Sequence, residues 1–346
     1  MVDAPRTEHI PLERFLWDWA QRDDLRRDVA GTVIAITTTA GELSRRIQRG
    51  ALDGDLAATT LGNGRKEIDL WAHCRLIDAL TPAPVAALLS EEAERSIALN
   101  PGAPLAVSFD PLDGTNNIDT NASVGTLFSV LPTGGRIGDE IFLQPGTAQL
   151  ASGYVIYGPQ CILTLTVGEG THQFTFDRDE QKFRLTARHL AIPYTSSEYA
   201  INASNYRFWS DAIQSYIDDC ISGREGPRSE DVNMRWIGSM VAECHRILVR
   251  GGVYLYPRDS RHGYEHGRLR LLYEANPMAF LIEQAKGKAI DGFTRAMELV
   301  PTALHQRTPL MFGSADEVDR IHMYKTNAHQ TFERSPLFGR RGLLKR

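Results

Sequence analysis

The 346-residue sequence lacks the features that mark several specialised classes of protein. No uninterrupted apolar run approaches the ~20 residues that a membrane-spanning helix needs, and the charged first residues contain no apolar signal segment. The four cysteines lie far apart with no CxxC pair, which predicts reduced thiols that are mostly in the core. The small excess of 43 acidic over 38 basic residues argues against a nucleic-acid or membrane partner. We therefore expect a soluble, cytoplasmic protein.

The composition is that of an ordinary globular protein. It is 42% hydrophobic and 23% charged, with no internal repeat, biased tract or low-complexity linker. A chain of this length can form two domains or one large layered domain with a sizeable core. Composition marks no boundary between domains, and the best candidate is the change of pattern near Ile192 and Pro193.

Apolar spacing predicts helices and strands along the chain. Helices are expected over residues 25–48, 69–80, 239–250 and 276–285, where apolar residues recur every three or four positions. Strands are expected over residues 85–89, 105–109, 124–131, 151–157, 161–167, 172–176, 253–256 and 269–273, many of them separated by Gly and Pro turn signals.

Acidic residues follow three of these predicted strands. Glu91 and Glu92 come after strand 85–89, Asp110 and Asp113 after strand 105–109, and Glu274 directly after strand 269–273. A rigid sheet holds carboxylates at its strand ends, where they still reach an open edge. Because Mg²⁺ is a hard cation that takes oxygen ligands, the five acids are candidate ligands for Mg²⁺, with Mn²⁺ as an alternative ion.

The segment DPLDGTNNID, from Asp110, joins these acids to groups that bind anions. Pro111 fixes its φ angle and Gly114 relaxes the backbone, so we expect a loop in which both aspartates and the Leu112 carbonyl converge. The N–H groups of the following GTN form an anion-binding turn. Cation ligands beside phosphate donors are what phosphoryl transfer to water requires. The residues alone leave open the alternative of solvated loop charges and a simple turn.

DPLDGTNNID and the VGTLFSV at residue 124 resemble the signature of class I fructose-1,6-bisphosphatases, in the inositol monophosphatase superfamily. Other members of the superfamily carry a looser D-P-[IL]-D-G-[TS] and a downstream motif built on W-D. Here the downstream LRLLYEANPMAFLIEQ, from residue 269, has the bisphosphatase form. RWIGSMVA at residue 235, GGVYLYP at 251 and VPTALHQR at 300 also match, and the likeness extends from about residue 10 to 325.

The resemblance implies a fold, a reaction and an assembly. The fold is the family's α/β layered αβαβα five-layer sandwich, and the assembly is usually a homotetramer. The reaction is hydrolysis of the 1-phosphate of fructose 1,6-bisphosphate, a small sugar bisphosphate. The implied division places a metal-binding domain with the family's allosteric region at 1–192, a substrate-binding α/β domain at 193–335 and a basic tail at 336–346.

The resemblance also implies roles for individual residues. The metal positions are Glu91, Glu92, Asp110, Asp113, Glu274 and the Leu112 carbonyl. The 1-phosphate segment is Asp113, Gly114, Thr115 and Asn116. The 6-phosphate grip is Asn202, Arg235, Trp236, Tyr256 and Arg268, with Arg235 reaching across from a neighbouring subunit. The other substrate positions are Met240, Tyr254 and Leu255. For catalysis, Glu92 is our choice of general base, Asp69 its helper in activating water, and Arg270 a support of the centre.

The chain departs from the family pattern at several of these positions. Trp236 and Asn205 replace tyrosines, and the only polar donor of a Trp is its indole N–H. Arg268 replaces a lysine, and Arg can still grip a phosphate bidentately. Asn63 replaces an acid that partners the arginine at position 270.

Regulation by AMP is not expected. Residues 25–30 and Pro104-Leu105 stand where animal-type enzymes carry the G-T-G-E-L-T-like loop and Lys-Tyr pair that bind AMP. We therefore predict an AMP-insensitive enzyme. The regulatory cysteine insert of the chloroplast enzyme is missing too, so thioredoxin control is not expected.

Two alternative functions stay open. One is a sedoheptulose-1,7-bisphosphatase or dual-specificity bisphosphatase, and the other is an inactive phosphosugar-binding regulator. The second alternative predicts missing metal ligands, whereas all five acids are present. Outside the site, His245 is expected to be a core or interface histidine, and His305 a structural anchor.

Overall fold

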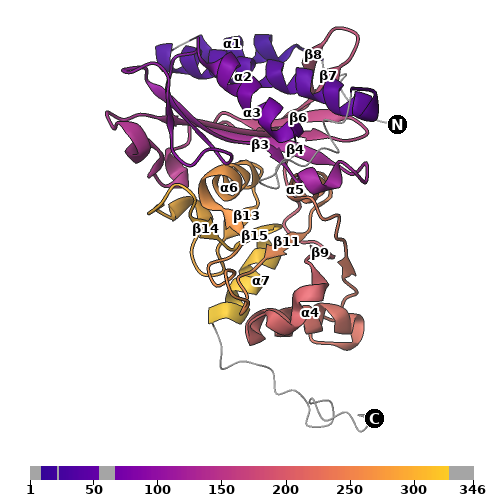
Figure 1. The fold of residues 1–346 in the computed structure, drawn as a ribbon. Coiled ribbons are helices and arrows are strands. Elements are labelled where there is room, and N and C mark those ends of the chain that lie inside the picture. Colours follow the sequence, from indigo (N-terminus) through magenta and orange to yellow (C-terminus); the bar gives the residue numbers. More distant parts are fainter. Residues whose placement is uncertain (1–8, 22, 54–66, 327–346) are drawn as a thin grey trace.

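The computed structural model describes residues 9–21, 23–53 and 67–326, and every structural statement below refers to them. Asn63, the GRK at 64–66 and the basic tail lie outside these residues. The described chain forms two large β-sheets, a separate two-stranded sheet and three layers of helices. The large sheets and the helices are stacked in the order α-β-α-β-α (Figure 1). The αβαβα expectation is thereby confirmed.

The larger sheet has eight strands. Within it β1 and β3 run parallel, and every other neighbouring pair is antiparallel. In spatial order they are β2 (Ile97–Ala98), β1 (Val85–Ser90), β3 (Leu105–Asp113), β4 (Val124–Pro132), β5 (Ala151–Tyr157), β6 (Cys161–Thr166), β7 (Thr171–Asp177) and β8 (Lys182–Ala187). Strands β3, β4 and β5 are buried along nearly their whole length because helices cover both faces. This explains why they appear in the sequence as continuous apolar runs rather than as an alternating pattern.

The smaller sheet and the helices complete the layers. In order, the small sheet contains β10 (Asn233–Met234), β9 (Glu198–Ala200), β11 (Val253–Tyr256), β15 (Leu310–Gly313) and β13 (Lys288–Ile290). Strand β12 (Leu269–Arg270) pairs separately with β14 (Arg307–Thr308).

The helices are α1 (Leu12–Ala20), α2 (Asp24–Arg49), α3 (Glu67–Leu80), α4 (Asp211–Ser222), α5 (Met240–Arg250), α6 (Asn276–Gln284) and α7 (Ala315–Thr326).

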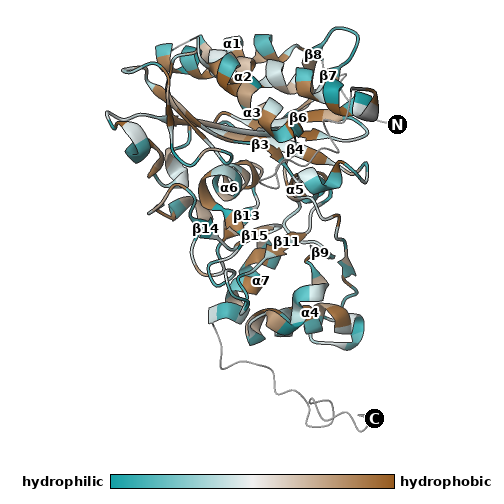
Figure 2. Ribbon diagram, in the orientation of Figure 1, coloured by the Kyte–Doolittle hydropathy of each residue, from teal (hydrophilic) through white to brown (hydrophobic). Residues whose placement is uncertain are grey.

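Four apolar cores join these layers. The first lies between α1–α3 and the large sheet, the second surrounds α5 and α6 between the two sheets, and the third lies between the small sheet and α4 and α7. A smaller fourth core packs residues of β1, β3 and β4 against Phe142 and Tyr273. Figure 2 shows teal and brown residues alternating along α1 and α2, as expected for helices with one buried face. Asp23 caps α2 by accepting the N–H of Leu25 at 2.7 Å.

The predicted elements are confirmed with two exceptions. The helices predicted at 25–48, 69–80, 239–250 and 276–285 correspond to α2, α3, α5 and α6, and most of the predicted strands are present within a few residues of their expected ends. None of the described helices is both long enough and apolar enough to cross a membrane. The two exceptions both concern the candidate site.

The first exception is the segment from Asp110 to Asp113, which was expected to be a loop but continues strand β3. Asp110 pairs with Leu127 and Asp113 with Gly125, so three steps along β3 oppose two along β4. This register shift is a β-bulge, which inserts one extra residue. Residues three apart in a regular strand point to opposite faces, and the extra residue brings both aspartates to the same face.

The second exception is the strand predicted over 269–273. It ends at Arg270, and Leu271–Ala275 forms a π-helical turn that runs into α6. The apolar run is buried on all sides, so its pattern cannot distinguish strand from helix. Glu274 consequently lies on a helical turn rather than after a strand.

Candidate active site

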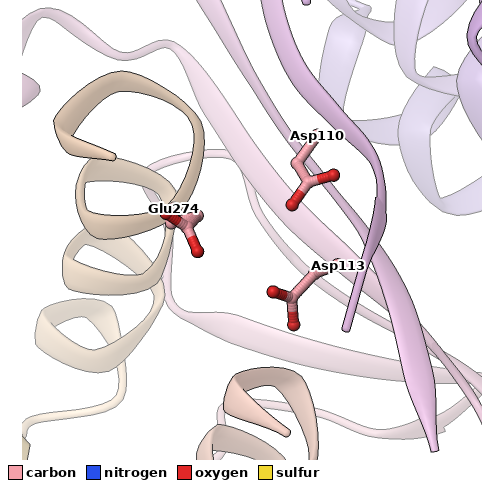
Figure 3. A group of neighbouring side chains, drawn as sticks. All are labelled: Asp110, Asp113 and Glu274. Atoms are coloured by element: carbon pink, nitrogen blue, oxygen red, sulfur yellow. The ribbon is translucent and has the colours of Figure 1, made fainter. Parts of the chain in front are cut away.

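Three carboxylates from two distant segments meet between the layers. Asp110 and Asp113 come from β3, and Glu274 comes from the π-helical turn before α6. One oxygen from each side chain lies within 4.8 Å of the others. Figure 3 shows the three carboxylates around a common space between the strand and the helix. The convergence expected for these three acids is therefore present in the structure.

Backbone groups hold these carboxylates in place. Asp110 accepts the N–H of Leu112 at 3.0 Å and Glu274 accepts the N–H of Arg270, while the nearby backbone of Val241 favours the charged form of Asp113 and so acts to lower its pKa. Val241 lies in the first turn of α5, whose positive dipole end favours a negative charge. Gly125 allows this approach, because a Cβ there would lie 2.8 Å from both Val241 methyl groups.

Without a cation, the site disfavours the charged form of all three carboxyl groups. Burial, then repulsion from Glu91 and neighbouring acids, raises the pKa of Asp110 and of Glu274 well above their usual values. Burial and Glu91 raise the pKa of Asp113 to about 7. Burial disfavours each charged form, and like charges increase the cost.

This arrangement fits a hard divalent cation. Oδ2 of Asp113 is buried and has no hydrogen-bond partner among the described residues. Three oxygen donors around one space are the donor type that such ions take. A cation there would satisfy the orphaned oxygen and offset the repulsion between the carboxylates.

Glu91 and Glu92 lie at the same end of the sheet as Asp110. β1 runs parallel to β3, so their carboxyl ends share an edge, and the Glu91 N–H donates to the Phe109 carbonyl at 3.1 Å. Glu91 contributes to the raised pKa of all three clustered acids. Glu92 follows on the turn, where its backbone N–H donates to Ser90 Oγ at 3.2 Å.

Arg270 connects this edge to the segment before β14. Its Nε lies 3.5 Å from a Glu91 carboxylate oxygen, and its Nη1 donates to the His305 carbonyl at 3.0 Å. His305 also contacts the Tyr273 hydroxyl at 3.3 Å. His305 thus has the anchoring position expected for it, and Arg270 lies beside a predicted metal ligand.

Helix α3 brings Asp69 towards the end of β1. Asp69 is buried in the first turn of the helix. His73, one turn further along, contacts Ser90 Oγ through Nδ1 at 2.8 Å. Residues four apart share a helix face, so Asp69 and His73 lie on the side of α3 that meets β1.

The GTN segment follows the bulge directly. Gly114 has φ 77°, and Thr115–Asn117 forms a 3₁₀ turn whose first N–H groups have no acceptor within the turn. The Asn117 amide donates to the Gly238 carbonyl at 3.2 Å. This bond ties the segment, with Thr115 and Asn116, to the loop that carries Trp236.

Aromatic rings line the side of the site formed by the small sheet. Trp236 stacks on Tyr254 with 6.0 Å between ring centroids and an interplanar angle of 7°, and its centroid lies 6.5 Å from that of Tyr256. Repulsion from Asp113 and Glu274 adds to the effect of burial in raising the pKa of Tyr254. The aromatic wall and the carboxylates therefore belong to one site. Met240 starts α5 beside this wall and is buried.

The remaining predicted substrate residues lie further along the small sheet. Asn202 caps a 3₁₀ turn by accepting the Ser204 N–H at 3.2 Å, and it lines a small cavity with Tyr256. The Leu255 side chain is fully buried in the third core, as alternation along β11 requires. Arg268 is exposed next to β12.

Arg235 lies at the edge of the small sheet, with about half of its side chain exposed. Its Nε is 3.4 Å from Glu198, an acid that also pairs with Arg246 at 2.6 Å and Arg250 at 3.0 Å. Arg235 therefore pairs with Glu198 at the sheet edge while about half of its side chain stays open to solvent.

Comparison with known proteins agrees with this geometry. Family models for the N-terminal and C-terminal domains of fructose-1,6-bisphosphatase match residues 12–188 and 192–326. The chain belongs to the fructose-1,6-bisphosphatase family. The resemblance seen in the sequence is thereby confirmed.

Several members of this family are similar over nearly their whole length. A fructose-1,6-bisphosphatase class 1 from Xanthobacter autotrophicus is 51% identical over 96% of this chain and 92% of its own length. One from Methylorubrum populi is 50% identical over 94% of each chain. The crystal structure of Leishmania major fructose-1,6-bisphosphatase in holo form superimposes with a TM-score of 0.84 at 34% identity, covering 92% of this chain and 99% of that one.

Some residues at the site could not be found from the sequence pattern. Glu198, which pairs with Arg235, is the first residue of a short strand and carries no motif. Ser90 and His73 tie α3 to the end of β1, and only their contact in space reveals this. His245, by contrast, behaves as expected, because it is mostly buried and its Nδ1 contacts the Tyr154 hydroxyl at 3.1 Å.

Proposed function

We propose that this protein is a magnesium-dependent fructose-1,6-bisphosphatase that hydrolyses the 1-phosphate to give fructose 6-phosphate and phosphate. The observation that carries the proposal is the meeting of Asp110, Asp113 and Glu274 beside the GTN segment. Close relatives over nearly the full chain bear the name fructose-1,6-bisphosphatase class 1, which supports the same activity here.

The acids would hold roughly two or three Mg²⁺ ions, or Mn²⁺ in their place. The proposed ligands are Glu91, Glu92, Asp110, Asp113, Glu274 and the Leu112 carbonyl. When bound, divalent cations neutralise charge on the phosphate oxygens and make a water more acidic. The raised pKa values and the unpartnered Asp113 oxygen support this placement.

We assign the catalytic roles from where each residue lies in the fold. Glu92, at the open end of β1, would accept the proton of the attacking water. Asp69, on the facing side of α3, would help to orient that water. Arg270 would hold Glu91 through their 3.5 Å ion pair. The N–H groups of Gly114, Thr115 and Asn116 would bind the 1-phosphate and stabilise its developing charge.

The other half of the site would recognise the sugar and its second phosphate. Met240 and the residues Tyr254 and Leu255 of β11 would line the sugar, Leu255 through its backbone. The proposed 6-phosphate residues are Asn202, Trp236, Tyr256, Arg268 and Arg235 of a neighbouring subunit. The half-exposed side chain of Arg235 at the sheet edge supports its reach into a neighbour's site. A homotetramer is proposed as the assembly.

We also propose that the enzyme is cytoplasmic, insensitive to AMP, and divided near residue 192 into metal-binding and substrate-binding domains. Residues 25–30 and Pro104-Leu105 contain none of the Thr, Lys and Tyr side chains of the loop and pair that bind AMP in the sensitive enzymes. We expect millimolar AMP to leave the rate of phosphate release unchanged. Strong inhibition by AMP in that assay would contradict the proposal.

The function itself is tested by phosphate release from a panel of sugar phosphates, with and without Mg²⁺. The expected result is the highest kcat/KM on fructose 1,6-bisphosphate, abolished by chelation. A higher kcat/KM on sedoheptulose 1,7-bisphosphate would assign the protein to that substrate instead. Zero release from every bisphosphate would favour an inactive phosphosugar-binding regulator.

A further inference from the structure

Arg268 is a cation that forms no ion pair in the described part of the chain, although its charge contributes to lowering the pKa of Asp259. Its side chain is exposed, and it makes no hydrogen bond or ion pair with any described residue. It does contact an aromatic ring, because its guanidinium carbon lies 4.8 Å from the centroid of Tyr264. All five guanidinium N–H donors are therefore available to a ligand.

A second arginine contacts the same ring. The guanidinium carbon of Arg261 lies 4.4 Å from the Tyr264 centroid and 5.0 Å from that of Phe208. Asp259 binds one edge of this guanidinium, accepting from its Nε at 3.0 and 3.2 Å and from Nη2. The other terminal nitrogen, Nη1, has no partner among the described residues. Arg261 is thus fixed on one edge and one face.

The backbone of the loop determines where the Tyr264 ring lies. The Tyr264 N–H donates to the Arg261 carbonyl at 3.0 Å, and the Tyr264 carbonyl accepts from Asp259 at 3.2 Å and Gly267 at 3.0 Å. Gly267, at φ 84°, packs so closely that a Cβ there would lie 2.2 Å from the Pro309 nitrogen. The ring therefore stands on a closed, well-packed loop rather than on a free one.

Both arginines lie within electrostatic reach of Tyr256, which lines the small cavity with Asn202 and Asp259. Burial raises the pKa of the Tyr256 hydroxyl, and the positive charges of Arg268 and Arg261 oppose that rise. Asp259 forms part of the same cavity wall and also binds Arg261. The two guanidinium groups, the Tyr264 ring and the hydroxyl of Tyr256 therefore form one local group.

We propose that Tyr264 is a positioning residue that determines specificity, because its ring holds Arg261 and Arg268 as a paired cationic grip for the second phosphate of the substrate. This inference rests on the proposed function. A planar guanidinium that stacks on a ring keeps its hydrogen-bonding edge oriented and loses less freedom when it binds phosphate. No hydrogen bond or ion pair to a described residue orients Arg268, so the ring should matter most for this side chain.

The test compares Tyr264→Leu with Tyr264→Phe, which keeps the ring. The Tyr264 hydroxyl makes no hydrogen bond with any described residue, so the Phe variant should behave like the wild type. Loss of the ring should raise KM for fructose 1,6-bisphosphate by about three- to ten-fold, the range expected for lost cation–π contacts. The kcat should stay within about two-fold of the wild type, since bound substrate still reaches the metal site.

Two further ligands separate this role from a general structural one. Inhibition by fructose 6-phosphate, which carries the second phosphate, should weaken by the same factor in Tyr264→Leu. KM for fructose 1-phosphate, which lacks it, should not change, and thermal melting should show both variants folded. Arg268→Gln should have the same effect as Tyr264→Leu, and the double variant should add little to it.

Three results would overturn the inference. They are equal KM values for Tyr264→Leu and wild type, equal effects in the Leu and Phe variants, or an equal rise in KM for fructose 1-phosphate. If the wild type hydrolyses no bisphosphate, the proposed function fails, but calorimetry of fructose 6-phosphate binding to the same variants still tests the grip. Equal affinity of wild type and Tyr264→Leu in that titration would contradict it.

Discussion

Glu274→Gln should change the stability of the protein in opposite directions with and without a divalent cation. The substitution keeps the shape of the side chain and removes one charge from the three carboxylates that meet within 4.8 Å. Two unit charges at that distance repel by about 3 kcal/mol at an effective dielectric constant of about 20. The new amide can also donate to Asp110 or Asp113. At pH 8 in a chelator, the variant should therefore be more stable than the wild type by about 2–3 kcal/mol.

Addition of Mg²⁺ should reverse this order. A cation that binds only the folded state at about 100 times its dissociation constant adds about 2.7 kcal/mol of stability. The wild type should gain this stabilisation, and Glu274→Gln should lose most of it along with one carboxylate ligand. Thermal melting of both proteins, in chelator and across a Mg²⁺ titration, measures the two effects directly. Roughly 2 °C per kcal/mol is expected for a chain of this size.

Glu283→Gln is the matched control for this comparison. Glu283 lies on α6, close to Glu274 in sequence, but pairs with Arg295 at 2.9 Å away from the cluster. Its replacement should leave the Mg²⁺-induced shift intact. The reasoning is refuted if Glu274→Gln melts below the wild type in chelator, or if both proteins gain equal stability from Mg²⁺.

Three further predictions concern other parts of the molecule. Glu92→Gln should lower kcat by about 10²–10⁴-fold while substrate still binds, and near-normal turnover in a steady-state assay would remove its role as base. Gly125→Ala should destabilise the fold by about 1–3 kcal/mol in urea unfolding, because the added Cβ would meet Val241. The companion change Val241→Ala should recover part of that loss. Burial lowers the pKa of His172 to about 4, so protons bind the unfolded state more strongly and stability should fall as the pH drops from about 6.5 towards 4. His172→Gln should flatten this dependence, and an unchanged slope would contradict it.

Much of the fold could be predicted because its strongest signals are local. Apolar residues recur along α2 with the period of a helix, and the apolar residues that begin β3 form a run of strand length. The acids at residues 91, 92, 110 and 113 each follow a predicted strand, and they share one edge of the sheet because β1 and β3 are parallel neighbours. The family resemblance supplied the substrate residues, which no local pattern distinguishes from ordinary surface residues.

The rest depends on contacts between distant segments. A bulge at Asp110–Asp113 is decided by pairing with β4, and nothing in DPLD itself separates a bulged strand from a loop. Leu271, Leu272 and Tyr273, which begin the π-helical turn, are all apolar and buried, so their pattern shows no period that would separate a helix from a strand. The stacking of Arg261 and Arg268 on Tyr264 joins residues of an irregular loop, for which spacing predicts no common face.

The most direct test of the account is the identity of the product formed from fructose 1,6-bisphosphate. Purified protein is incubated with this substrate in Mg²⁺ or in chelator, and the released phosphate and the remaining sugar monophosphate are measured. The account predicts one phosphate per substrate, fructose 6-phosphate as the only sugar product, and no reaction in chelator. Release of the 6-phosphate, or equal rates with and without Mg²⁺, would contradict it.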